Sequence, residues 1–418
     1  MGARPLLRYQ PPLGVLVMLI AFIATGLRIG IVPFFPELRE AYGIGNAEVG
    51  LLFSAFFVTF TLLQFPAGFA ADRLPARRVL LASLLGLIAA TFLFLLTTTW
   101  PAALTARLLM GACAAWIFPT VVQWILRAAP PRRHASIFGL FETGIALAFF
   151  VSLSIVPLLA AYLGLHSSHV VLGVMAFAVA GLLARSIALR SHLPPPPDPA
   201  ANEGDGVWRA PSPYTRYSVA RRLTLLVGLT AFATLPAAAV MTWTPTYLYD
   251  VLRYDATAVG LTMGLLTGTY VIVAYLSGRW ADERPRLPIM NTGAALAFFG
   301  IVALLVFDRP PAPVMGAVAV LLGAGFALSF TPFMVFVAQL FGPRRAGVSA
   351  ALMTTTAQLS NIAAGVLFGW IIDMTGRFTL VWVIAALCSP LRVAVCRLVE
   401  EVLPDAVDQL PPDLEITS

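Results

Sequence analysis

One arginine lies deep within a long apolar stretch near the N-terminus. Arg28 belongs to an apolar run that begins at Leu13. If this run is a helix, its rise per residue places Arg28 roughly 22 Å from the helix start, beyond comfortable reach of either face of a membrane. A guanidinium binds a carboxylate through two parallel hydrogen bonds. Arg28 therefore predicts a binding site for an organic anion within a membrane.

Two more ionisable side chains lie within apolar runs. Glu142 is a carboxylate that either binds and releases a proton or pairs with Arg73 or Arg127 near the end of its helix. Arg107 lies close to a predicted helix end, so it either faces the interior or extends along the membrane surface. We expect Glu142 and Arg107 to take part in ion coupling, with a proton as the coupling ion.

Amide and phenol side chains mark further polar positions in the apolar runs. Gln358 and Asn361 are three residues apart and therefore share one face of a helix. This face is expected to line a cavity, because an amide is costly against lipid. Gln123 and Tyr270 lie deep in other runs and are expected to line the same path.

The composition excludes most other classes of protein. The chain is 59% hydrophobic and 11% charged, and its net charge of +7 is carried by arginine alone. These values exclude a soluble enzyme, a secreted disulfide-rich domain and a disordered chain. The basic residues are spread over many short loops, which disfavours nucleic-acid binding. With no nucleotide motif, and only His166 and His169 as a candidate metal pair, we expect no cofactor, no metal and no enzymatic activity.

The apolar runs predict an all-α membrane protein with twelve transmembrane helices. Four consecutive prolines at 194–197, with nearby charges, predict a hydrophilic linker. The expected domains are an N-terminal six-helix bundle at 1–190, a cytoplasmic linker at 191–222, a C-terminal six-helix bundle at 223–399 and a cytoplasmic tail at 400–418. The expected helices span 13–35, 48–71, 79–98, 102–126, 135–163, 170–189, 223–248, 257–280, 287–307, 313–341, 346–372 and 379–399.

Arginines gather in every second connection between these helices. Basic loops stay on the cytoplasmic side of a membrane, so both termini are expected there, in a bacterial inner (plasma) membrane. The two halves also share motifs at an offset of about 212 residues, which predicts two repeats with a cavity between them. The only arginines in the odd-numbered connections are Arg39, Arg253, Arg309 and Arg377. The repeated motifs form three pairs: Gly68 and Asp72 match Gly278 and Asp282, Gly111 and Pro119 match Gly323 and Pro332, and 131–133 match 343–345.

On these motifs, the sequence resembles the major facilitator superfamily along nearly its whole length. The resemblance implies that family's fold of two pseudo-symmetric six-helix bundles. It also implies a latch on the outward-open state, formed by the loop after helix 2 and its second copy. Arg107 and Gly111 are similar to the family's fourth-helix motif. The expected gating residues are Gly68, Asp72, Arg73, Arg77, Gly278, Asp282 and Arg284.

Segments 27–33, 50–57, 64–68 and 242–248 resemble the anion:cation symporter branch of that superfamily. In that branch a first-helix arginine binds the negative charge of the substrate, which implies this role for Arg28. The resemblance adds Trp243 and Tyr247 to the expected substrate-binding residues. The acid that often precedes this arginine is Leu27 here, and the acid expected in helix 4 is absent, so no proton site carries over to helix 4.

The resulting hypothesis is a monomeric secondary transporter that moves a small organic anion by alternating access. Its expected partners are the anion, a proton and the lipid bilayer. An exporter of amphipathic drugs or lipids on the same fold remains the alternative, with Arg28 neutralised by Glu142 or by the amides at Gln358 and Asn361. The glycine–proline motif that marks many drug antiporters is absent from helix 5, which disfavours this alternative. The paired gate motifs disfavour a receptor without transport.

Overall fold

A computed structural model describes residues 10–129, 134–163, 219–283, 286–307, 310–341 and 346–400. Every regular element in this part of the chain is helical. The elements are α1 (Gln10–Ile29), the 3-10 helix η2 (Val32–Phe34), α2 (Phe35–Tyr42), α3 (Asn46–Arg73), α4 (Ala76–Leu95), α5 (Trp100–Ala114), α6 (Ile117–Ala128), α7 (His134–Phe150), the π-helical turn η4 (Val151–Ile155), α8 (Val156–Leu163), α10 (Val219–Asp250), α11 (Ala256–Glu283), α12 (Arg286–Val306), α13 (Ala312–Phe341), α14 (Ala346–Thr375) and α15 (Thr379–Glu400).

Eleven helical stretches in the described residues are long and apolar enough to cross a membrane. The prediction of an all-α polytopic membrane protein is therefore confirmed. The predicted sixth helix at 170–189, most of the predicted linker and the predicted tail lie outside the described residues.

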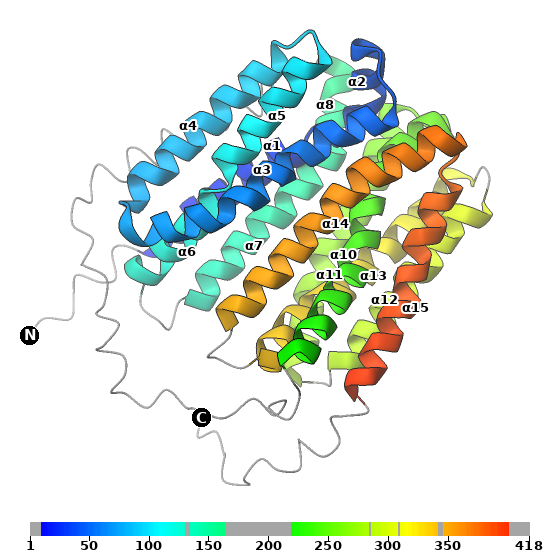
Figure 1. The fold of residues 1–418 in the computed structure, drawn as a ribbon. Coiled ribbons are helices and arrows are strands. Elements are labelled where there is room, and N and C mark those ends of the chain that lie inside the picture. The colour runs from blue at the N-terminus through cyan, green and yellow to red at the C-terminus, as the bar shows by residue number, and fades with distance from the viewer. Residues whose placement is uncertain are drawn as a thin grey trace, which may run out of the picture.

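The helices form an N-terminal group, α1 to α8, and a C-terminal group, α10 to α15 (Figure 1). In the N-terminal group α1 packs on α7, and α3 and α4 pack on α5. In the C-terminal group α11 and α12 pack on α13, while α10 packs on α14 and α15. The most extensive contact between the groups joins α3 to α14. The two groups are therefore packed against each other along α3 and α14.

Some predicted helix limits were wrong. The first helix ends at Ile29 rather than at residue 35, because Gly30 and Pro33 interrupt it and the chain continues as η2 and α2. The predicted helix at 102–126 is divided into α5 and α6, and the one at 135–163 contains the π-helical turn η4. α10 begins at Val219, inside the segment predicted to be linker.

Glycines allow close helix packing on α5 and α11. A Cβ at Gly111 would lie 2.1 Å from the Phe56 carbonyl oxygen, so α5 and α3 are in backbone contact. On α11, Gly260 faces the Ser154 carbonyl oxygen, which a Cβ would approach to 2.7 Å. Glycine thus allows α11 to pack closely on the backbone of η4.

One end of the molecule carries α2, the start of α3 and the ends of α10 and α14 (Figure 1, top). We call it the α2 end. α3 ends and α4 begins at the opposite end.

Candidate functional site

Arg28 lies in the last turn of α1. Its guanidinium carbon is 5.4 Å from the centre of the Phe57 ring on α3. Its Nε is buried and has no hydrogen-bond acceptor in the described part of the chain. Within the same residues, no carboxylate lies within ion-pair distance of Arg28. The side chain is only partly buried overall, which leaves it accessible to a small molecule.

Arg107 on α5 is fully buried and has several acceptors. Its Nε donates to the Leu52 carbonyl oxygen at 3.1 Å, and its Nη2 donates to the Arg28 carbonyl oxygen at 3.0 Å. Its Nη1 donates to the Leu27 carbonyl oxygen at 3.5 Å. These carbonyls belong to the last turn of α1 and to α3, and a cation is favourable at the C-terminal end of a helix. Arg107 therefore does not extend to the membrane surface; it holds the end of α1 that carries Arg28.

Glu142 on α7 is the acidic residue that interacts electrostatically with Arg28. Tyr270 on α11, in the C-terminal group, lies within electrostatic range of Glu142. The Glu142 side chain is exposed, and Tyr270 is partly buried. Three predicted site residues from three helices and both groups, Arg28, Glu142 and Tyr270, therefore lie within electrostatic range of one another through Glu142.

The charges around the end of α1 do not balance within the described residues. Arg28 and Arg107 are close enough to repel each other, and Glu142 is the carboxylate that interacts with Arg28. Two cations and one anion leave one excess positive charge. An uncompensated charge within a membrane costs several kcal/mol by order of magnitude. The site is therefore suited to binding an anion.

Aromatic rings fill the space between this site and the α2 end. The Phe57 ring lies 4.9 Å from Phe53, which lies 6.3 Å from Phe35 on α2. Phe35 in turn packs at 5.4 Å on Trp243 of α10, in the other group. Phe378, just before α15, continues the series at 6.4 Å from Trp243. We call these five rings the aromatic seal.

Trp243 and Tyr247 are both predicted to bind substrate. Trp243 is fully buried, and its Nε1 donates to the Ala364 carbonyl oxygen at 2.6 Å. Tyr247 is buried, and its hydroxyl donates to the Leu304 carbonyl oxygen at 3.4 Å. In this conformation Trp243 belongs to the seal and Tyr247 packs on its Phe378 ring. A role of these two residues in substrate binding stays a prediction.

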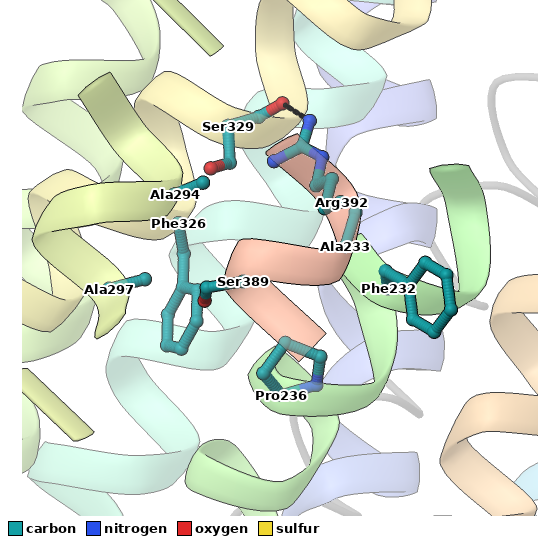
Figure 2. A pocket seen from close by; sticks show the side chains of 9 residues that line it. All are labelled: Phe232, Ala233, Pro236, Ala294, Ala297, Phe326, Ser329, Ser389 and Arg392. Atoms are coloured by element: carbon teal, nitrogen blue, oxygen red, sulfur yellow. Dashed lines mark hydrogen bonds between the residues drawn. The ribbon is translucent and has the colours of Figure 1, made fainter. Parts of the chain in front are cut away.

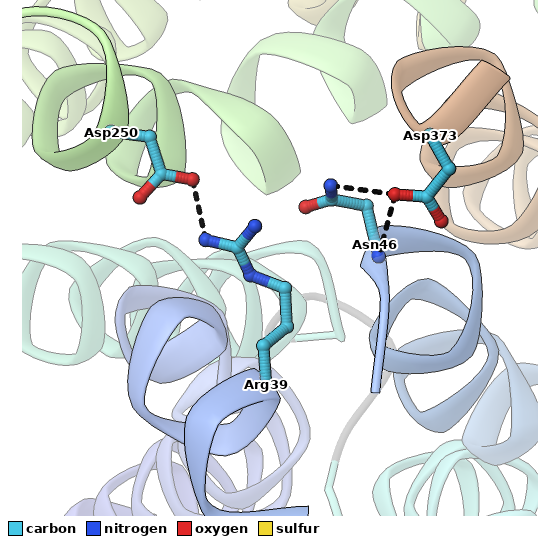
Figure 3. Close-up of polar contacts among 4 residues, drawn as sticks. All are labelled: Arg39, Asn46, Asp250 and Asp373. Carbon is cyan, nitrogen blue, oxygen red and sulfur yellow. Dashed lines mark hydrogen bonds and ion pairs between the residues drawn. The ribbon is translucent and has the colours of Figure 1, made fainter. Parts of the chain in front are cut away.

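Charged side chains close the α2 end above the seal. Arg39 on α2 forms an ion pair with Asp250, the last residue of α10 (Figure 3). Asp373 on α14 accepts hydrogen bonds from the backbone N–H of Asn46 at 3.0 Å, from the Asn46 side chain at 2.8 Å and from the backbone N–H of Ala47 at 2.7 Å. The N-cap of α3 is Gly45, which has no side chain to accept these donors. Asp373 supplies this cap from the other group of helices.

The backbones of α3 and α14 touch below this cap. A Cβ at Gly50 would lie 2.0 Å from the Gly365 carbonyl oxygen, and one at Gly369 would lie 2.3 Å from the Asn46 carbonyl oxygen. The Ser54 hydroxyl donates to the Ile362 carbonyl oxygen at 2.9 Å. We call these contacts the glycine seam. Only residues without a side chain allow two helices to approach so closely.

The three amide residues predicted to bind substrate lie on two helices, α14 and α6. On α14, Asn361 Nδ2 donates to Gln358 Oε1 at 3.4 Å, so the two amides share a face as predicted. They lie next to Ile362, on the side of the seam away from the α2 end. Gln123 is partly buried on α6, which leads toward the end of the molecule opposite the α2 end. Substrate contact by these amides stays a prediction.

The predicted gate lies at the opposite end. Among the described residues, a Cβ at Gly68 would meet nothing within 4 Å, and one at Gly278 would meet only the Thr331 side chain, at 3.8 Å. Neither glycine therefore makes a close helix contact with the described part of the chain. Asp72, Arg73 and Arg77 lie where α3 ends and α4 begins, and Asp282 lies in the last turn of α11, but their side chains are outside the described part; Arg284 lies outside the described residues altogether.

Sequence reasoning missed several residues of the interface. Asp250 and Asp373 fall in predicted loops, although Asp373 continues the four-residue spacing of Gly365 and Gly369. That spacing is a recognisable sign of close helix contact. Arg392, fully buried in α15, was also missed, although it gives the same signal as Arg28: a basic residue inside an apolar run.

Two packed groups of membrane-crossing helices, closed at one end and holding a cationic site between them, define a polytopic membrane protein of the transporter class. Residues 17–365 match the Major Facilitator Superfamily. The chain belongs to this superfamily, as its motifs predicted.

Relatives of known name agree with this assignment. The chain is 24% identical over 391 residues to the probable sulfoacetate transporter SauU of Cupriavidus necator, with 89% of each chain covered. It is 22% identical over 395 residues to the hexuronate transporter of Bacillus subtilis, covering 88% of this chain and 89% of that one. Among solved structures, it resembles a bacterial homologue of the human lysosomal transporter Spinster in an inward-facing and occupied conformation, with a TM-score of 0.76, 14% identity and coverage of 98% and 100%. This last likeness concerns the fold alone.

Proposed function

We propose that this protein is a secondary transporter that carries a small organic anion with a carboxylate or sulfonate group by alternating access. The excess positive charge around Arg28 is the observation that carries the proposal. Arg28 has a buried Nε without an acceptor among the described residues, while Arg107 has acceptors for its own donors. The names of the two relatives, which refer to sulfoacetate and hexuronate, support an anionic substrate.

The α2 end faces the outside of a plasma membrane in this proposal, with both termini and the linker in the cytoplasm. The arginine-rich connections at the opposite end support this orientation. The aromatic seal and the glycine seam then close the path to the outside. The open surroundings of Gly68 and Gly278 support access to Arg28 from the cytoplasm. The conformation is therefore an inward-facing one.

Uptake into proteoliposomes tests the charge anchor. We expect Arg28→Gln to lower uptake of sulfoacetate or hexuronate by about 100-fold, since a charge-assisted hydrogen-bonded pair contributes roughly 3 kcal/mol. Arg28→Lys should retain part of the activity, because it keeps the charge and loses the planar two-pronged geometry.

Arg377→Gln is the matched control, because Arg377 is exposed at the α2 end. It should transport like the wild type, and a neutral hexose should not be taken up by any variant. Equal uptake of the organic anions by wild type and Arg28→Gln would contradict the proposal. So would transport of lipophilic cations in place of anions.

Glu142 is the proton site in this proposal. Its carboxylate and an anionic solute compete for the positive charge of Arg28, so protonation of Glu142 favours binding of the solute. Glu142 lies within electrostatic range of Arg28 in one helix group and of Tyr270 in the other, and this position between the groups supports the role. A proton and an anion would then cross together.

Glu142→Gln separates coupling from binding. It should keep anion exchange across the membrane, while acceleration of net uptake by an inward proton gradient should fall by about tenfold, the equivalent of roughly 1.4 kcal/mol. Exchange and gradient-driven uptake are measured in the same proteoliposomes. An unchanged response of Glu142→Gln to the gradient would remove Glu142 from the coupling mechanism.

A further inference from the structure

Buried polar atoms without a hydrogen-bond partner lie next to the aromatic seal. Thr244 and Thr246 on α10 are both 0% exposed, and neither hydroxyl has a partner among the described residues. The Nε1 of Trp382, in the first turn of α15, is buried and has no acceptor among them either. Trp382 stacks at 6.2 Å on the Phe378 ring of the seal, and Thr244 directly follows Trp243 in α10. The closed seal therefore has polar groups beside it that the described residues leave unpaired.

Other buried threonines show what these two lack. Thr230 is also 0% exposed on α10, and its hydroxyl donates to the Leu226 carbonyl oxygen at 2.7 Å. Thr267 on α11 donates in the same way to the Met263 carbonyl oxygen at 2.6 Å. A bond to the carbonyl four residues earlier is an ordinary way for a helix to pair a buried hydroxyl. Without such a bond, a buried hydroxyl loses its hydrogen bonds to water and gains none in return.

Pro245, between the two threonines, weakens α10 at the same place. A proline inside a helix has no N–H to donate to the carbonyl four residues earlier, and its ring clashes with that carbonyl. Helices bend most readily at such positions. Beyond Pro245, α10 continues for one turn to Asp250 at the α2 end. This last turn is therefore joined to the rest of α10 where the backbone hydrogen bonds are incomplete and two hydroxyls are unpaired.

Arg392 on α15 gives a contrast away from the α2 end. Its Nε is also buried without an acceptor among the described residues, but its Nη2 donates to the Ser329 carbonyl oxygen at 2.7 Å. Its side chain also borders a small pocket between α10, α12, α13 and α15, which has room for about one water molecule (Figure 2). Neither Thr244 nor Thr246 borders this pocket. Arg392 thus keeps a protein partner, whereas each threonine has a single polar group and that group is unpaired.

We propose that the unpaired hydroxyls of Thr244 and Thr246 bias the α2 end toward opening, because opening admits water to them. The glycine seam and the cap that Asp373 gives to α3 favour the closed conformation. The unpaired hydroxyls oppose these contacts, which keeps the closed and open conformations close in free energy. This inference rests on the proposed alternating access, in which the α2 end opens in every transport cycle.

Thr244→Val and Thr246→Val test the proposal, because valine has the shape of threonine without the hydroxyl. The double variant of the full chain in lipid nanodiscs should have a Tm about 2–4 °C above that of the wild type. Each single variant should raise the ratio of closed to open α2 ends by about fivefold. Spin-label distances between Glu40→Cys on α2 and Met374→Cys on α14, both exposed, measure this ratio. Anion uptake should slow by a similar factor, because the closed end reopens less often.

Thr230→Val is the matched control, because it removes a hydroxyl that is equally buried on the same helix but has a partner. It should leave Tm unchanged or lower it, and it should leave the spin-label distances unchanged. An unchanged or lower Tm in the double variant would overturn the proposal, because the hydroxyls would then be paired in the closed conformation.

A rise in Tm without a shift toward the closed α2 end would overturn the proposal as well, because the hydroxyls would then be unpaired in both conformations. Tm and spin-label distances are measured without substrate. Failure of the proposed function appears separately, as unchanged anion uptake in Arg28→Gln.

Discussion

The two helix groups meet differently at the α2 end and in the middle of the membrane. At the α2 end, Arg39 has Asp250 as its partner, and Asp373 accepts three hydrogen bonds from the start of α3. In the middle, Arg28 has a buried Nε without an acceptor in the described residues and interacts with Glu142 only through space. Both regions carry charges, but among the described residues an ion pair forms only at the α2 end.

This difference assigns the two regions different tasks. The contacts of Arg39 and Asp373 at the α2 end form only when the two groups touch, so they stabilise one conformation over another. Arg28 forms no ion pair with a described residue in that same conformation, and in the proposed function an anionic solute supplies its partner. Alternating access requires both properties: an interface that can separate and a site that both groups help to form.

The largest effect on the α2 end is expected from Gly50→Ala. A Cβ at this position would lie 2.0 Å from the Gly365 carbonyl oxygen, and a backbone atom cannot move aside as a flexible side chain can. The α2 end should then fail to close, and uptake should fall by at least about 30-fold, the equivalent of roughly 2 kcal/mol.

Gly228→Ala on α10 is the control, because its Cβ would meet nothing within 4 Å. It should transport and purify like the wild type. The comparison between the α2 end and the middle would fail if Gly50→Ala transported normally. Size-exclusion chromatography of both variants separates a closure defect from misfolding.

A smaller effect, on stability, distinguishes the two arginines at the end of α1. Arg107→Met leaves the carbonyls of Leu27, Arg28 and Leu52 without their donor and should cost about 2–4 kcal/mol. Arg28→Met removes an unpaired buried donor and should leave the stability unchanged or raise it. Thermal unfolding in nanodiscs measures both variants. A larger loss of stability in Arg28→Met than in Arg107→Met would reverse the roles given to them.

The smallest effect is expected from the Arg39–Asp250 ion pair. Its side chains are 22% and 30% exposed, so water screens the pair and it contributes about 1 kcal/mol. Arg39→Gln or Asp250→Asn should raise the population with an open α2 end by about fivefold. Spin-label distances across the α2 end measure this population. The double variant should add little to either single variant, and additive effects would show that the two side chains act separately.

The fold was largely predictable from the sequence because it depends on long patterns. Apolar runs of membrane length predicted the helices, and repeated motifs predicted two related groups. The limits of the first helix were less predictable. Gly30 and Pro33 interrupt it, although glycine and proline are common within membrane helices, and only the surrounding contacts decide whether they break one.

The site was predictable where one residue is costly in a membrane, and not where a contact joins distant segments. Arg28 and Glu142 were found because charged side chains are rare in apolar runs. The cap that Asp373 gives to α3 joins residues 327 positions apart, and nothing in either local sequence specifies the other. Arg107 was recognised, but its carbonyl acceptors are backbone atoms, which a residue pattern does not reveal.

A structure determined with sulfoacetate or hexuronate bound tests the central claim most directly. The account predicts that oxygens of the carboxylate or sulfonate lie within about 3 Å of the Arg28 guanidinium nitrogens, with Arg107 still bound to the end of α1. An anion bound elsewhere, or Arg28 in a direct ion pair with Glu142 while the anion is bound, would contradict it.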